Sequence, residues 1–279
     1  MTWKELLNFG VSQLKNNNIS DPEFDAMQLI LTFFENSYSN YCMRLSEKVT
    51  AGDVDKYSEL INNRVNKVPL QYILGKWDFY DSTFFVGEGV LIPRAETEEL
   101  VEFCIDYIKT NNCKVIYDLC SGSGCIGLSI AKECPDTQCY LFELYQGALF
   151  YLNKNLDALG LKNVKIIRCD VLSDVCIDVD KADLIVSNPP YIESGEIPTL
   201  QTEVQQEPIT ALDGGIDGLD FYRAFYNNWT DKLNEHGLFA FECGELQSQD
   251  ICKIFSDKFL SNVKYDMYGV DRFVILRKI

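Results

Sequence analysis

The sequence has one histidine, His236, and its 11 cysteines include no CxxC pair. That scarcity excludes serine-histidine-aspartate triads and histidine-rich metal sites, and we predict no bound metal. His236 stands beside Gly237 at a position that the pattern assigns to a helix end, so we expect it to cap a helix. The chemistry of the chain must therefore use other side chains.

Long apolar runs are also lacking, and no stretch approaches the ~20 residues that a membrane helix needs. The N-terminus is amphipathic rather than signal-like, so we expect a cytoplasmic protein. The cysteine count is odd, and several cysteines fall within apolar patterns, which indicates buried, reduced thiols. These are Cys104, Cys125, Cys139, Cys169 and Cys252.

Basic residues are few: 25 Lys and Arg stand against 42 Asp and Glu, for a net charge of −17. Proteins that bind nucleic acid hold its phosphates largely through Lys and Arg, and this chain shows no basic run. An acidic protein instead attracts a basic protein partner and speeds the encounter. The charge therefore disfavours direct nucleic acid binding and favours a protein partner.

The patterns along the chain divide it into three regions. Residues 1–75 are expected to form a small helical domain. Residues 76–93 have the pattern of a β-hairpin linker, and strand and helix patterns alternate through residues 94–279. That alternation predicts an α/β fold, in which a mainly parallel sheet carries helices on both faces. Residues 263–267 and 272–277 are close enough in sequence to pair antiparallel at the sheet edge.

Capping residues mark two helix starts in the first region. Thr2-Trp3-Lys4-Glu5 is a capping box, and Asp21-Pro22-Glu23 begins a second helix. In that second helix Phe24, Met27 and Leu31 share one face, which we expect to be buried.

The most informative segment is Asp183-Leu184-Ile185-Val186-Ser187-Asn188-Pro189-Pro190-Tyr191, in which a buried strand pattern stops abruptly. The two prolines cannot donate to a sheet ladder, so the chain must leave the sheet there. Ligands of open α/β sheets bind at the carboxyl ends of the strands. Asn188 offers a side-chain carbonyl, Pro189 a backbone carbonyl and Tyr191 a flat ring, which together suit a planar NH2 group. An ordinary turn explains the same residues equally well when they are taken alone.

A glycine loop about seventy residues upstream favours the ligand interpretation. The strand pattern 114–119 includes Asp118 and is followed by Cys120, Ser121 and the GxGxxG spacing of Gly122, Gly124 and Gly127. A further strand pattern ends in Glu143, whose carboxylate can accept from ribose hydroxyls. Asp170 closes the strand between this one and the Asn-Pro-Pro-Tyr segment. The glycine loop and Glu143 alone fit a nicotinamide dehydrogenase as well as any other nucleotide-binding enzyme.

With the Asn-Pro-Pro-Tyr strand end added, the chain resembles class I S-adenosylmethionine-dependent methyltransferases that modify amino groups. The resemblance narrows to the protein-(glutamine-N5) methyltransferases that modify peptide chain release factors, and it runs from about Trp3 to Arg277. The segments that carry it are Pro69-Leu70-Gln71-Tyr72-Ile73-Leu74-Gly75, Val90-Leu91-Ile92-Pro93-Arg94-Ala95-Glu96-Thr97-Glu98, Glu207-Pro208 with Ala211-Leu212, and Gly218-Leu219-Asp220-Phe221-Tyr222-Arg223. It implies a Rossmann-like fold with a mainly parallel seven-stranded sheet, which follows the N-terminal helical domain along the sequence.

The resemblance also implies roles for individual residues. Asn188, Pro189 and Tyr191 would form the catalytic clamp on a glutamine amide, with Pro190 and Arg94 completing the substrate site. S-adenosylmethionine would be the cofactor, and class I release factors, methylated in their Gly-Gly-Gln loop, would be the substrates of a monomeric enzyme. The cofactor residues would be Asp118, Cys120, Ser121, Gly122, Gly124, Glu143, Asp170 and Asn188.

Three positions depart from the family pattern. Cys120 stands where glycine is usual, Ala95 where proline is usual, and Tyr145 where a small hydroxyl residue is commoner. We expect the loops to keep their course, although Cys120 restricts the backbone more than glycine would.

Four other functions remain open at this point. A ribosomal-protein glutamine methyltransferase shares nearly every motif. A nucleic-acid amino-group methyltransferase shares the clamp but conflicts with the charge. A nicotinamide dehydrogenase would bind NADH and transfer no methyl group, and a non-catalytic binding module would leave both the clamp and the loop unused.

Overall fold

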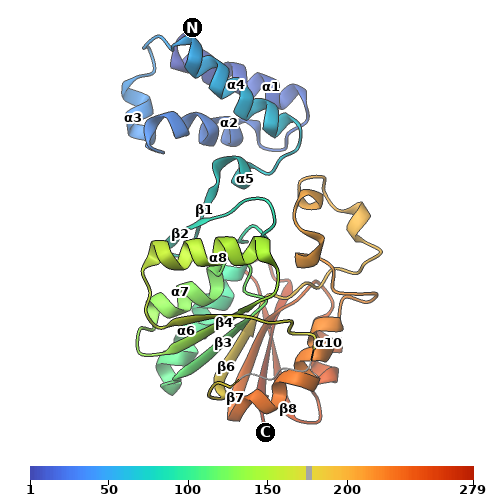
Figure 1. Ribbon diagram of the computed structural model, residues 1–279. Coiled ribbons are helices and arrows are strands. Elements are labelled where there is room, and N and C mark those ends of the chain that lie inside the picture. The colour runs from blue at the N-terminus through green and yellow to red at the C-terminus, as the bar shows by residue number, and fades with distance from the viewer. Residues whose placement is uncertain (174–177) are drawn as a thin grey trace. The chain divides into compact units, whose positions relative to one another are not determined.

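The computed structural model describes residues 1–173 and 178–279 and shows two compact units (Figure 1). The first unit comprises Met1–Lys76 with Gln201–Gln206, and the second comprises Trp77–Leu200 with Glu207–Ile279. The hairpin that we expected as a separate linker thus has its residues from Trp77 onward in the second unit. No helix in the described ranges is both long and apolar enough to cross a membrane.

The first unit is helical. Its elements are α1 (Trp3–Asn16), α2 (Pro22–Leu31), a 3-10 turn at Thr32–Phe34, α3 (Tyr38–Met43), α4 (Ala51–Val65) and α5 (Leu70–Leu74). The predicted capping box is confirmed, because Thr2 accepts from the Glu5 backbone N–H at 3.3 Å and Glu5 accepts from the Thr2 N–H at 2.9 Å. The helix start predicted at Asp21 is confirmed too, whereas α3 and α5 are short and were not predicted.

The buried face of α2 differs from the prediction. Leu31 is buried as predicted and Met27 is partly buried, but Phe24 is 43% exposed, and Asp25 lies on the buried face instead. The reason is an ion pair: Arg64 of α4 donates from Nε to Asp25 Oδ2 at 2.6 Å, and from Nη1 to Glu203 Oε1 at 3.1 Å. A charge buried with its partner is invisible to a pattern that counts only apolar residues.

The second unit is built on a seven-stranded sheet in the order β5-β4-β3-β6-β7-β9-β8. The strands are β3 (Val115–Leu119), β4 (Gln138–Glu143), β5 (Val164–Arg168), β6 (Ala182–Ser187), β7 (Leu233–Glu242), β8 (Phe259–Tyr265) and β9 (Asp271–Lys278). The first five run parallel, and β9 pairs antiparallel with both β7 and β8. The predicted fold class and the predicted antiparallel edge are therefore confirmed.

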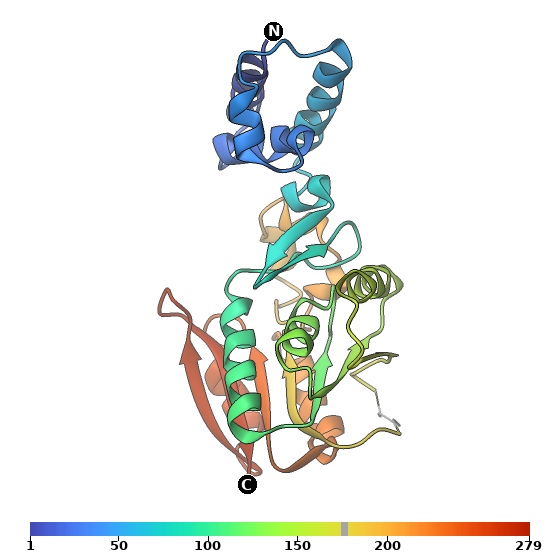
Figure 2. The same ribbon diagram turned by 90° about the vertical axis from the view of Figure 1, so that its left-hand side faces the viewer.

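Helices cover both faces of this sheet because successive strand residues point to opposite sides (Figure 2). Ile116 packs in one core with α6 (Thr97–Asn111), α7 (Cys125–Glu133) and α8 (Gln146–Leu159), while its neighbour Tyr117 packs in the other. That second core contains residues of α9 (Asp220–Ala224), of the π-helical turn Phe225–Trp229 and of α10 (Ser248–Ile254). The hairpin β1 (Lys76–Phe79) and β2 (Ser82–Phe85) forms a separate sheet. Further 3-10 turns lie at Ile197–Thr199, Val204–Gln206, Ile209–Ala211 and Thr230–Lys232.

Strand register decides which residues meet at the carboxyl edge. Leu119 at the end of β3 pairs with Phe142 of β4 on one side and with Ser187 of β6 on the other. The chain order reverses across β3, and ligands bind at such a switch point. The residues that follow these three partners, Cys120, Glu143 and Asn188, therefore stand at the same level of one edge.

Two smaller predictions need correction. His236 caps no helix: it lies inside β7 with φ +61, where the pairing with β6 shifts register, as in a β-bulge. Each cysteine in the described part of the chain is a free thiol, as predicted. Only some of those expected to be buried are so, since Cys125, Cys169 and Cys252 are partly exposed.

Candidate active site

A cleft of about 910 Å³, counting the space that opens to solvent, lies at this edge of the sheet. Its walls come from the glycine loop after β3, the ends of β4, β5 and β6, and residues preceding α6 and α9. The predicted site residues that line it are Arg94, Cys120, Ser121, Gly122, Glu143, Asp170, Asn188 and Pro190; Asp118, Gly124, Pro189 and Tyr191 do not.

The glycine loop is held from several sides. Gly122 (φ +55) donates its N–H to Glu143 Oε2 at 2.9 Å, and the Ser121 hydroxyl donates to the Asp118 carbonyl at 2.8 Å. Gly124 (φ +83) begins α7, and a side chain there would collide with Leu152, whose Cδ1 would lie 2.3 Å from the added Cβ. The loop thus presents backbone groups and a helix N-terminus to the cleft.

Cys120 adopts a left-handed conformation, with φ +60. Glycine reaches that region without cost, while any other residue is strained there. Burial raises the pKa of the Cys120 thiol well above its ordinary value, so the side chain is a neutral wall of the cleft. Cys120, at the position where glycine is usual in the family pattern, therefore holds its backbone in a strained conformation.

Glu143 is buried at the end of β4. Its Oε1 accepts from the backbone N–H groups of Leu144 and Tyr145, both at 2.8 Å. Burial raises the pKa of Glu143, and these bonds with that from Gly122 oppose the rise. Each carboxylate oxygen has two lone-pair sites, so Oε1 is already saturated and Oε2, which accepts only from Gly122, retains capacity for a ribose hydroxyl.

Asp118 lies beneath the loop rather than in the cleft. Its Oδ2 accepts from the Gly127 N–H at 3.0 Å, which caps the first turn of α7, and Oδ1 is buried with no partner among residues 1–173 and 178–279. Burial raises the pKa of Asp118 to about 7. The position fits a carboxylate that shapes the loop from below.

Asp170 is exposed at the end of β5, where Oδ1 accepts from the Leu172 N–H at 3.0 Å. The other carboxylate oxygen can accept from an exocyclic amino group. Apolar Leu144 and Val171 line the same part of the cleft, as a flat base requires.

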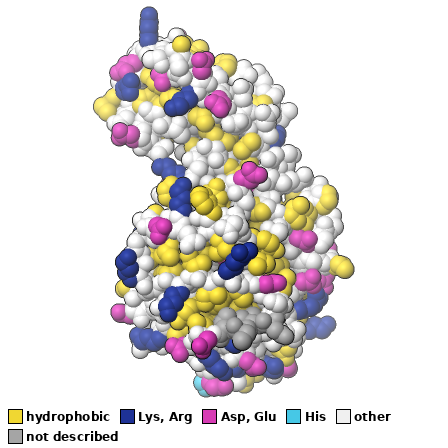
Figure 3. Space-filling model, viewed as in Figure 1, with side chains coloured by type: hydrophobic (Ala, Val, Ile, Leu, Met, Phe, Trp, Pro, Cys, Tyr) yellow, Lys and Arg dark blue, Asp and Glu magenta, His cyan; other side chains and the backbone are white. Residues whose placement is uncertain are grey.

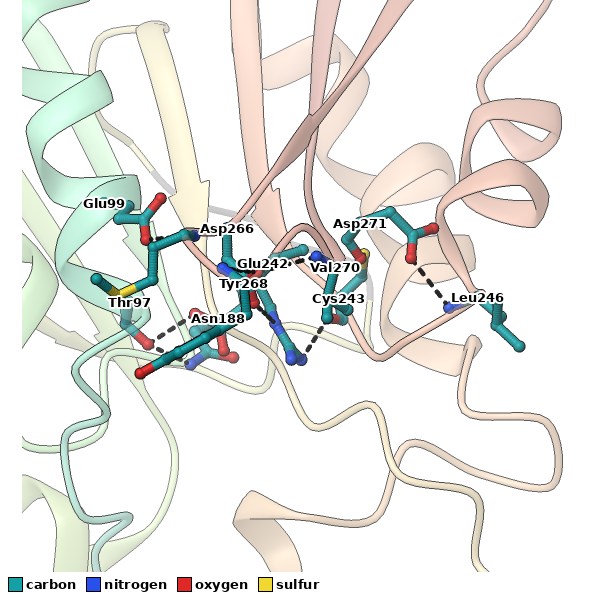
Figure 4. A network of polar contacts seen from close by, with 12 residues as sticks. Thr97, Glu99, Asn188, Glu242, Cys243, Leu246, Asp266, Tyr268, Val270 and Asp271 are labelled. Carbon is teal, nitrogen blue, oxygen red and sulfur yellow. Dashed lines mark hydrogen bonds and ion pairs between the residues drawn. The ribbon is translucent and has the colours of Figure 1, made fainter.

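Asn188 is oriented by two residues whose roles the sequence did not reveal. Its Nδ2 donates to Thr97 Oγ1 at 3.3 Å, and that hydroxyl donates to Glu242 Oε2 at 2.7 Å (Figure 4). Burial raises the pKa of Glu242 to about 7. Glu242 follows the apolar run 238–241, so the strand-end reasoning that identified Glu143 could have found it.

Tyr191 packs away from the cleft. Its backbone carbonyl accepts from Gln247 Nε2 at 2.9 Å, and a side chain added at Gly244 would lie 3.3 Å from the Tyr191 ring. Burial raises the pKa of its phenol far above the ordinary value. The ring therefore supports the strand end from behind.

Arg94 is fixed at the cleft wall by Glu207. The guanidinium forms an ion pair with Glu207 Oε1, and Oε2 of the same buried carboxylate accepts from the Ile92 N–H at 2.9 Å. Glu207 therefore ties two turns together beside the cleft, a role that the sequence did not suggest.

These residues fit S-adenosylmethionine. Backbone groups of the glycine loop would hold the methionine end, the buried Glu143 carboxylate would suit the ribose, and Asp170 with its apolar neighbours would suit the adenine. Asn188 adds an amide, fixed by Thr97, to the lining of the same cleft, and a dehydrogenase does not need such an amide.

Comparison with known proteins agrees. Residues 5–75 match the model of the PrmC N-terminal domain, and residues 96–212 match that of the methyltransferase small domain. A 16S rRNA methyltransferase from T. thermophilus, solved with AdoMet and guanosine, superposes with a TM-score of 0.49 and 17% identity, over 73% of this chain and 50% of that chain.

Curated relatives are more similar. Release factor glutamine methyltransferase from Clostridium acetobutylicum is 39% identical over 82% of this chain and 81% of its own length. The protein of the same name from Clostridium botulinum is 34% identical over the full length of both chains. This chain therefore belongs to the release factor glutamine methyltransferase family, and S-adenosylmethionine is its cofactor.

Proposed function

We propose that this enzyme transfers the methyl group of S-adenosylmethionine to the side-chain amide nitrogen (N5) of the glutamine in the Gly-Gly-Gln loop of class I peptide chain release factors. The observation that carries the proposal is the Asn188 amide, tethered through Nδ2 so that its oxygen is left for a ligand in the cofactor cleft. A fixed carbonyl acceptor beside a methyl donor is what an NH2 substrate requires.

The reaction needs positioning more than proton transfer. An amide nitrogen is a weak nucleophile because its lone pair is delocalised into the carbonyl. Asn188 Oδ1 and the Pro189 carbonyl each accept one N–H of the glutamine amide, which fixes the nitrogen and stabilises positive charge as it develops there. When bound, S-adenosylmethionine supplies a methyl group already activated by its positive sulfur. The nitrogen then releases a proton to solvent.

The remaining predicted residues hold the reactants. Glu143 binds the ribose and Asp170 the adenine amino group, while the loop of Ser121 to Gly124 receives the methionine end. Arg94, held by Glu207, borders the substrate side of the cleft. Tyr191 acts through its packing, since its ring does not line the cleft.

We assign residues 1–75 to docking of the release factor body. A folded partner held by a remote surface contributes binding energy that a short loop peptide lacks. The full-length enzyme should therefore have a much higher kcat/KM for a whole release factor than for a peptide of its Gly-Gly-Gln loop. Equal values would refute this role.

We propose that the enzyme binds protein and no nucleic acid. We also propose that it acts as a monomer in the cytoplasm, where translation takes place. The net charge of −17 supports the first point. On the face drawn in Figure 3, Lys and Arg side chains are scattered among acidic ones and form no continuous patch.

The test is methyl transfer from labelled S-adenosylmethionine to purified class I release factors, ribosomal proteins and duplex DNA. Label should enter the release factor and be lost when its loop glutamine is changed to alanine. Label in a ribosomal protein instead would transfer the assignment to that substrate class, and label in DNA would overturn a protein substrate.

A further inference from the structure

The Asn188 amide belongs to a chain of two hydrogen bonds that ends on a buried carboxylate. Asn188 Nδ2 lies 3.3 Å from Thr97 Oγ1, and Thr97 Oγ1 lies 2.7 Å from Glu242 Oε2. Figure 4 shows dashed lines joining Thr97 to both side chains. The three residues come from the end of β6, the start of α6 and the end of β7, so the fold assembles this pair of hydrogen bonds from distant segments of the sequence.

The donor and acceptor capacities of the three side chains decide which group donates in each of the two hydrogen bonds. An ionised carboxylate only accepts, so the single proton of the Thr97 hydroxyl is directed to Glu242. The free lone pair of Thr97 then accepts from an N–H, which Asn188 supplies from Nδ2. Turning the amide over would place Asn188 Oδ1 against the Thr97 oxygen with no proton between two acceptors.

We propose that Thr97 and Glu242 are positioning residues that set the flip of the Asn188 amide, so that its oxygen rather than its NH2 group faces the glutamine. The inference rests on the proposed function, because only an NH2 substrate needs an acceptor there. In the reverse flip, the Asn188 NH2 would meet the glutamine NH2, and no hydrogen bond could form.

The surroundings of Glu242 support a role beyond packing. Glu242 is 2% exposed, and no Lys or Arg in the described ranges forms an ion pair with it. Arg272 lies close enough to lower the pKa of Glu242, yet its guanidinium bonds Asp266 at 3.4 Å and the Cys243 carbonyl at 3.4 Å. A buried carboxylate that forms no direct ion pair is costly, and its one side-chain hydrogen bond in the described ranges is to Thr97, which fits a role in orienting that hydroxyl.

The test compares Thr97→Val with Thr97→Ser at pH 8, above the pKa of Glu242. Thr97→Val keeps the side-chain shape and removes the hydroxyl, so kcat for the release factor should fall about 10- to 100-fold, the range seen when a partner that orients a site ligand is lost. KM for the release factor and the Kd of S-adenosylmethionine should stay near the wild-type values. Thr97→Ser keeps the hydroxyl and should restore kcat to within about threefold of wild type.

Loss of the Thr97 hydroxyl leaves Glu242 buried without its partner and could impair folding. The double variant Thr97→Val/Glu242→Leu replaces both groups by apolar ones of similar size, which proteins tolerate better than one orphaned partner. It should bind S-adenosylmethionine normally and still be slow, because nothing then sets the amide flip.

Unimpaired kcat in Thr97→Val or in the double variant would overturn the inference, as would a loss in Thr97→Ser equal to that in Thr97→Val. These results differ from failure of the proposed function, in which the wild-type enzyme itself would transfer no methyl group to glutamine.

Discussion

The Glu143 carboxylate accepts the Gly122 backbone N–H at 2.9 Å, so the residue assigned to the cofactor ribose also holds the glycine loop in place. The two structures that shape the cofactor site are thus tied together before any ligand arrives. Preorganisation of this kind lowers the cost of binding, because less of the site must be ordered when the ligand enters.

Replacing Glu143 by alanine should therefore weaken cofactor binding in two ways, by removing the ribose acceptor and by releasing Gly122. We expect the Kd of S-adenosylmethionine to rise on the order of 10- to 100-fold, equivalent to about 1.4 to 2.7 kcal/mol. Calorimetric titration measures this directly. Asn188→Ala, which keeps Glu143 and its bond to Gly122, is the comparison and should raise this Kd far less. An unchanged Kd in Glu143→Ala would remove Glu143 from the site.

Asn188→Ala should show the opposite behaviour. In the proposed mechanism it removes one of two acceptors for the glutamine amide, which should cost on the order of 2 to 4 kcal/mol of transition-state stabilisation. The loss should appear in kcat for the release factor. Full turnover by this variant would show that the amide clamp is not used.

Backbone strain at Cys120 can be measured by comparing two replacements. Cys120→Gly and Cys120→Ala both remove the thiol, but only glycine is relaxed at φ +60. The glycine variant should be more stable to urea than the alanine variant by about 1 kcal/mol. Greater stability of the alanine variant would mean that the left-handed conformation is not a source of strain.

Asp118 should make stability depend on pH. Its pKa is raised by burial from 3.8 to about 7, so the folded state retains a proton that the unfolded state releases. Its stabilising contribution is complete below pH 3.8 and is lost as the pH rises through about 7. Between pH 5 and pH 8 the free energy of unfolding of Asp118→Asn should fall less than that of wild type. Equal falls would show that Asp118 has a normal pKa.

The sequence predicts the parts of the site in which a strand pattern ends in a polar residue. Glu143, Asp170 and Asn188 were identified because strand patterns stop at or just before them, and parallel register brings these strand ends to one edge. Pro190 lines the cleft while Pro189 and Tyr191 do not, which matches the alternation of side chains along an extended segment. That alternation, applied past the strand end, would have warned against a ring of Tyr191 in the cleft.

Contacts between distant segments could not be predicted in this way. Thr97 and Glu242 are 145 positions apart, and Arg94 and Glu207 are 113 apart. No periodicity specifies such pairs, because they depend on which strands become neighbours. The ion pair of Asp25 with Arg64, which places Asp25 on the buried face of α2, escaped the pattern for the same reason.

The most direct test of the account is to locate the transferred methyl group. A class I release factor is incubated with the enzyme and methyl-deuterated S-adenosylmethionine, and the Gly-Gly-Gln peptide is fragmented in a mass spectrometer. The account predicts one labelled methyl group on the side-chain amide of that glutamine and none in a parallel reaction without enzyme. Label at any other residue of the factor, or an unlabelled factor beside a labelled ribosomal protein, would contradict it.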